Sequence, residues 1–100
     1  MIDQKKKLPY IFGDFEIDEF FRLKKKINRS NFEYKKIKNL FFFPSGRWDI
    51  EMDSEVLIKL PQDNLEESLK LSYDILSDKN FVNVKIIDVR QLNQVVINAK

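Results

Sequence analysis

The sequence predicts one small α+β domain, in which a single antiparallel-dominated sheet carries two helices packed on it. Two segments, 14–30 and 64–78, place apolar residues at helical spacing. Shorter segments between and after them alternate apolar and polar residues, as half-buried strands do. The resulting order, α-β-β-β-α-β-β, is typical of a three-strand meander, a helical crossover and a terminal hairpin in one sheet.

The first element after the N-terminus is predicted to be an extended lead-in over residues 1–13. Its apolar run is interrupted by Pro9 and closed by Gly13, which favours a loop or a short extended piece over a helix. The helix over 14–30 then begins with clustered carboxylates and ends with clustered cations. That order complements the helix dipole, so the carboxylates need no acid/base or metal role to explain them.

Three strands are expected next, over 34–43, 47–52 and 56–60. In the first of these strands, Ile37, Phe41 and Phe43 are predicted to lie on the same, inward face. The second strand alternates charged and apolar residues, which predicts that its apolar side chains point inward and its charged side chains point outward. The inward set is Trp48, Ile50 and Met52, and the outward set is Arg47, Asp49 and Glu51.

The second helix is predicted to begin at a capping box, in which the Asn64 side chain accepts from the backbone of Glu67. Two strands follow it, over 81–90 and 94–99, and the second is expected at an edge of the sheet. The matched periodicities predict one core. Its expected members are Trp48, Ile50, Val56, Ile58, Leu69, Ile75, Val84 and Ile86.

Composition narrows the possible functions. The chain has no Cys and no His, which excludes disulfides and thiolate-metal sites and removes most zinc ligation, histidine-activated nucleophiles and the usual proton shuttle. Two glycines cannot form a Gly-rich phosphate loop. We therefore expect no catalytic residues, no cofactor and no metal, and no sequence feature supports a carboxylate-based hydrolase.

Lysine runs at 5–7, 24–26 and 35–36 leave two interpretations open. They suit a nucleic-acid or anionic-membrane surface, and together with 13% aromatic residues they keep a small basic nucleic-acid-binding domain as the alternative function. However, 16 acidic residues are interspersed and hold the net charge at +2, which favours ordinary solvated charge.

The last strand lacks the usual defences of a sheet edge. Val95, Val96 and Ile97 carry no charge, and no Pro or Gly interrupts them before Lys100. Exposed edges are normally blunted by such features because unpaired N–H and C=O groups recruit other chains. Either neighbouring strands cover both sides of this strand, or a partner does.

The order of these landmarks resembles a known family. The matching stretches are LPYIFG, FFRL, GRWDIEM, VLIKLP, NLEESL and IIDVR followed three residues later by QVVI. Over roughly Leu8 to Lys100 they are similar to the extracytoplasmic β domain of the FtsQ (DivIB) family of bacterial cell division proteins. The resemblance implies that 14–100 is this domain, and that 1–13 leads in from a preceding POTRA-like domain.

The resemblance also implies a function. Such domains are non-enzymatic divisome scaffolds, here expected on the periplasmic side of a single-pass inner-membrane protein at the division septum. They bind FtsB-like and FtsL-like partners, with a partner strand added to the last strand and the signature Arg paired with a partner carboxylate; no nucleic acid is expected. Carried over, the partner-binding residues are Arg90, Gln91, Gln94, Val95, Val96, Ile97, Asn98 and Ala99. Relatives have aromatic residues where this chain has Gln91 and Ala99, so side-chain contacts should differ from theirs.

Overall fold

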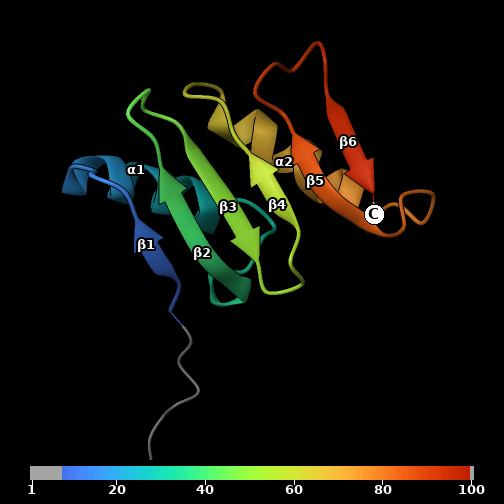
Figure 1. Cartoon of the computed structure of the whole chain (residues 1–100), viewed down its shortest axis with the longest axis horizontal. Coiled ribbons are helices and arrows are strands. Elements are labelled where there is room, and N and C mark those ends of the chain that lie inside the picture. The colour runs from blue at the N-terminus through green and yellow to red at the C-terminus, as the bar shows by residue number, and fades with distance from the viewer. Residues whose placement is uncertain (1–7, 100) are drawn as a thin grey trace, which may run out of the picture.

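A six-stranded sheet with two α-helices on one of its faces makes up the computed structural model, which describes residues 8–99 (Figure 1). The strands lie in the sheet in the order in which they occur along the chain, from β1 to β6. The elements are β1 (Tyr10–Phe12), α1 (Ile17–Arg29), the 3-10 helix η1 (Tyr34–Lys36), β2 (Ile37–Phe42), β3 (Trp48–Met52), β4 (Leu57–Lys59), α2 (Leu65–Ser77), β5 (Val84–Asp88) and β6 (Val96–Ala99).

The sheet is mixed, so the prediction of an antiparallel-dominated sheet is wrong. The pairs β2–β3, β3–β4 and β5–β6, in each of which the second strand follows the first along the chain without a helix between them, are antiparallel. The pairs β1–β2 and β4–β5 are parallel. In each parallel pair an α-helix connects the two strands and carries the chain back to the end at which the first strand began, which makes the second strand run parallel to it.

The predicted element order also missed one strand. Tyr10–Phe12 lies inside the expected lead-in 1–13, but it pairs with β2 and forms one edge of the sheet. Residues 1–7 of that lead-in lie outside the described residues. At the other end, β6 forms the second edge, as expected for the terminal strand.

One core fills the space between the helices and the sheet. Trp48 is 4% exposed and packs against Phe42 and Phe15, with ring centroids 4.8 and 5.5 Å away. Seven of the eight predicted core residues are buried, all except Ile86. The buried apolar set also includes Leu23, Ile27, Leu40, Leu60, Leu65, Ile87 and Val89.

Two β-bulges explain the wrong face assignments. A bulge inserts one extra residue into a strand, so every later side chain changes face. In β2 the register shifts between Ile37 and Asn39, which turns Leu40 and Phe42 inward. Phe41, predicted inward, lies on the opposite face and stacks on Phe12 with a centroid separation of 5.3 Å.

The second bulge lies in β5, between Val84 and Ile86. It leaves Ile86 partly exposed and buries Ile87 completely in its place. The start of α2 also differs from the prediction, because Asn64 adopts a left-handed conformation with φ 63° and its side chain makes no cap hydrogen bond.

Candidate partner-binding edge

Strand β6 presents the candidate edge. It pairs antiparallel with β5, with Val96 opposite Asp88 and Ile97 opposite Ile87. On its other side it has no strand neighbour among the described residues. Val96 is 43% exposed, whereas Ile97 packs against the core. The strand is therefore anchored through one side-chain face and open along its outer backbone.

The turn that leads into β6 forms a small hollow beside this edge. The backbone N–H of Gln94 donates to the carbonyl of Gln91 at 3.0 Å and closes the turn. The hollow has a volume of about 350 Å³ and is lined by Asp88, Arg90, Gln91, Gln94 and Val96. Four of the eight predicted partner-binding residues thus lie together around one concave surface.

The other predicted residues lie along the strand or beneath it. Val95 precedes β6 and, like Ile97, packs on the core. Asn98 is exposed, and Ala99 is the last residue of the strand, opposite Val84. Val95 and Ile97 can therefore contribute to the edge mainly through their backbone groups.

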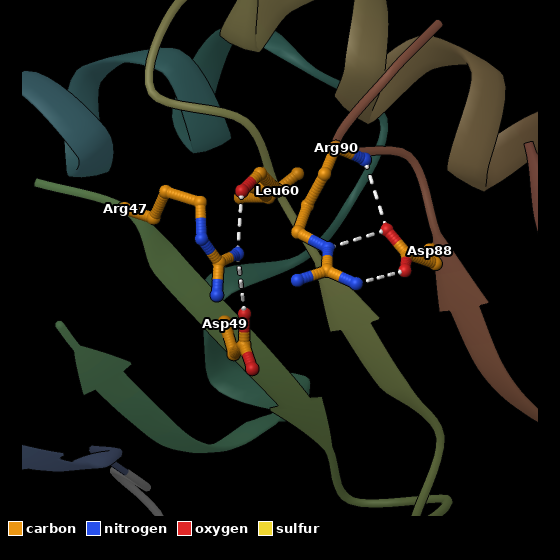
Figure 2. A network of polar contacts seen from close by, with 5 residues as sticks. All are labelled: Arg47, Asp49, Leu60, Asp88 and Arg90. Carbon is orange, nitrogen blue, oxygen red and sulfur yellow. Dashed lines mark hydrogen bonds and ion pairs between the residues drawn. The ribbon is translucent and has the colours of Figure 1, made fainter. Parts of the chain in front are cut away.

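Arg90 is held by Asp88, a contact that was not predicted. Its Nε donates to Asp88 Oδ1 at 2.9 Å and its Nη2 to Oδ2 at 2.6 Å, and the backbone N–H of Arg90 also donates to Oδ1 at 3.1 Å (Figure 2). Hydrogen bonding from Arg90 lowers the pKa of Asp88, and the same contact raises the pKa of Arg90. Within residues 8–99 the third guanidinium nitrogen, Nη1, makes no hydrogen bond, so Arg90 retains a free donor.

A second Arg–Asp pair lies nearby on the same face. Arg47 Nη1 donates to Asp49 Oδ1 at 3.1 Å and to the backbone carbonyl of Leu60 at 2.9 Å (Figure 2). Asp49 points outward from the helices as predicted, yet it is only 5% exposed. Burial raises the pKa of Asp49, opposed by the positive charges of Arg47, Lys59 and Arg90.

The sheet register aligns these charges in one row. Asp49 lies opposite Lys59, which lies opposite Asp88, which lies opposite Val96 at the open edge. Residues in register on neighbouring strands share a face of the sheet. With Arg47 and Arg90 beside the row, three cations and two carboxylates lead across the sheet to β6.

Spacing within each strand could have indicated both pairs. Side chains at i and i+2 of a strand point to the same face, so Arg47 and Asp49, like Asp88 and Arg90, are within reach of each other. The burial of Asp49 had no such signal, because it depends on how the strands pair across the sheet and not on spacing within one strand. Among residues 8–99, no group of three or more Asp or Glu side chains is placed to hold a metal ion.

Comparison with known proteins identifies a match to one protein family. The family model described as "Cell division protein FtsQ/DivIB, C-terminal" matches residues 2–90 of this chain. The match covers most of the fold and ends at Arg90, so the turn and β6 lie beyond it. No curated protein sequence matches the chain.

Proposed function

The chain belongs to the C-terminal domain family of the cell division proteins FtsQ and DivIB, and from this premise we propose that it is a non-enzymatic scaffold of the divisome. In this proposal it binds an FtsB-like protein, itself associated with an FtsL-like protein, by accepting a strand along β6. The proposed role requires no enzyme activity of this domain. The role is to hold other division proteins in place at the septum.

The open outer backbone of β6 is the observation that carries the proposal. β6 ends the sheet, bears no charge in its four residues and leaves Val96 exposed. An extended peptide can add to such an edge through main-chain hydrogen bonds, and pockets for alternate side chains then supply specificity. The hollow lined by Gln91 and Gln94 lies where the added strand would begin or end.

Arg90 supplies a charged contact at the same place. Asp88 fixes the guanidinium by two hydrogen bonds, which reduces the entropy lost when Arg90 contacts a partner. The free Nη1 can then donate to a partner carboxylate, a charge-assisted hydrogen bond. Gln91 and Gln94 flank this donor and can bond to backbone groups of the partner.

The expected location follows from the family. We propose that the domain is extracytoplasmic and belongs to a protein anchored in the inner membrane by one transmembrane helix. Neither helix within residues 8–99 has the length and apolar character needed to cross a bilayer. In this proposal the anchor therefore belongs to another segment of the protein.

Proline substitutions test the strand-addition mode. Neighbouring N–H groups of a strand point to opposite sides, and proline removes the donor at its own position. We expect one of Val96→Pro and Ile97→Pro to disturb pairing with β5 and lower stability. The other should remain folded and weaken binding to the purified FtsB–FtsL pair of the same bacterium by tenfold or more, measured by calorimetry. If the folded variant binds like the parent, strand addition to β6 is wrong.

A charge substitution tests Arg90 separately. Arg90→Glu should abolish or strongly weaken binding while the circular dichroism spectrum stays unchanged. Lys38→Glu is the matched control, because Lys38 is exposed on β2, four strands away from β6 in the sheet. An equal loss for both variants would mean that net charge, not the Arg90 contact, supports binding.

A further inference from the structure

The exposed side of the C-terminal half of α1, after the acidic first turn of that helix, carries a concentration of positive charge that the strand-addition role does not use. Between residues 22 and 38 the sequence has eight cations and one carboxylate, a net charge of +7 in a chain whose total is +2. α1 lies on the helix-covered face of the sheet, near the β1 edge and far from β6 (Figure 1). The charge is therefore displaced to one part of the molecule.

The fold brings the two lysine runs of this segment together. Lys24 Nζ lies 5.0 Å from the centre of the Tyr34 ring, which places η1 beside the C-terminal half of α1. Lys35 and Lys36 follow in η1 and are exposed. We call the surface formed by Phe21, Lys24, Lys25, Arg29, Lys35 and Lys36 the basic face.

Ion pairs neutralise only part of this charge. Glu66 of α2 accepts from Lys26 and Arg29, at 3.2 and 3.1 Å. Arg22 lies 3.8 Å from Asp63, and Lys35 lies 3.8 Å from Glu33. Among the described residues no ion pair involves Lys25, Lys36 or Lys38, and all three are exposed.

An exposed aromatic residue lies among these cations. Phe21 is 57% exposed, and it lines a shallow hollow together with Lys24, Lys25, Asn28 and Arg29. Ile17, one turn earlier on the same side of α1, is 58% exposed. Phe21 and Ile17 are not part of the core. The side chains that pack α1 against the core are Leu23 and Ile27, on the inner side of the helix, and both are fully buried.

We propose that the basic face docks peripherally on an anionic phospholipid bilayer. Clusters of four to eight cations on an amphipathic helix attract anionic lipid headgroups, and Phe side chains on such helices enter the boundary between headgroups and acyl chains. A hydrated soluble polyanion would use the lysines but would gain little from Phe21 and Ile17. The combination of unpaired cations and exposed apolar side chains therefore favours a lipid surface, which α1 would contact without crossing it.

The test is sedimentation of the 100-residue chain with vesicles of phosphatidylglycerol and phosphatidylcholine, compared with vesicles of phosphatidylcholine alone. We expect binding only to the anionic vesicles, weakening as salt rises because the headgroup attraction is screened. Lys25→Glu with Lys36→Glu should lower the apparent affinity roughly tenfold or more. Lys79→Glu with Lys85→Glu makes the same change in net charge at exposed positions outside the basic face and should bind nearly as the parent does.

The apolar contribution is tested with Phe21→Ser, for which Phe81→Ser, 40% exposed in the loop before β5, is the matched control. Phe21→Ser should weaken vesicle binding several-fold, and the control should not. Absence of binding to anionic vesicles at low salt would overturn the proposal, as would an equal loss for the two charge-reversal pairs. Binding that is unaffected by Phe21→Ser and fully displaced by polyphosphate would instead identify a surface for soluble polyanions.

Discussion

At the scale of single residues, two aspartates on one face of the sheet meet opposite electrostatic surroundings. Asp88 accepts two hydrogen bonds from the Arg90 side chain, which lower its pKa. Asp49 is more deeply buried, and desolvation raises its pKa even though Arg47 donates to it. The charged form of Asp88 is stabilised by Arg90 in the folded state. The charged form of Asp49 is destabilised by desolvation more than the neighbouring cations stabilise it.

These shifts predict opposite effects of amide substitution at pH 7. A lowered pKa in the folded state adds stability that is present above the ordinary aspartate value near pH 3.9 and is lost as the pH falls through the folded value. Asp88→Asn should therefore lower the free energy of unfolding at pH 7, by up to about 1 kcal/mol because the pair is partly solvated, with the difference closing below about pH 4. Because the folded pKa of Asp49 is raised, ionisation reduces stability as the pH rises through that value, and Asp49→Asn should match or exceed the parent at pH 7.

Urea denaturation at pH 7 and pH 3 measures both effects, and carbon NMR of the two carboxyl groups assigns each titration. An equal loss of stability for the two variants at pH 7 would contradict the opposite pKa shifts. The sequence indicated that each Arg–Asp pair shares a face, but the direction of the pKa shift at Asp49 is set by its burial in the folded sheet, which outweighs the nearby positive charges. No local pattern carries that information.

At the scale of elements, Gly13 determines how the edge strand β1 joins α1. It has a φ of 117°, and a Cβ atom built there would lie 2.4 Å from the backbone carbonyl oxygen of Phe42. Gly46, in the turn between β2 and β3, also has a positive φ of 88°, but the nearest atom there is the flexible end of the Gln62 side chain at 2.9 Å. Backbone cannot move aside as cheaply as a side-chain terminus.

Gly13→Ala should therefore destabilise the fold more than Gly46→Ala. Both changes introduce backbone strain of about 1–3 kcal/mol, and only the first adds a clash with main chain of the neighbouring strand. Thermal denaturation followed by circular dichroism ranks the two variants. A larger loss for Gly46→Ala would mean that β1 does not pack against β2 as described.

Most elements could be predicted from the sequence, and the errors have common causes. Helical periodicity located α1 and α2, and alternation located β3 together with its inward residues Trp48, Ile50 and Met52. The bulges in β2 and β5 could not be predicted, because an extra residue is accommodated by the partner strand and leaves no mark on composition. β1 has only three residues, too few for alternation to distinguish it from an extended lead-in.

At the scale of the whole molecule, the two proposed contact surfaces lie far apart. β6 forms one edge of the sheet, whereas α1 lies towards the β1 edge on the helix-covered face (Figure 1). A partner strand on β6 would leave the basic face free, so both contacts can be made at once. The part of the candidate site that the sequence located was the open strand; the Asp88–Arg90 pair and the hollow beside it required the fold.

A single core joins these two regions, and it predicts cooperative unfolding. Leu69 of α2 is completely buried in the same cluster as Trp48 of β3 and Ile27 of α1. Leu69→Ala should lower the free energy of unfolding by about 2–5 kcal/mol, because it removes buried methyl groups and leaves a cavity. Leu71→Ala is the matched control on the same helix; Leu71 is only partly buried, so its loss should be smaller.

Because Trp48 is the only tryptophan and reports the core directly, its fluorescence and the far-ultraviolet circular dichroism should give coincident urea transitions in the parent. Leu69→Ala should move both transitions to lower urea by the same amount. If the fluorescence transition stayed in place while the dichroism transition moved, α2 would unfold independently of the sheet. The packing of α2 would then not stabilise the sheet against which α1 packs and in which β6 forms an edge.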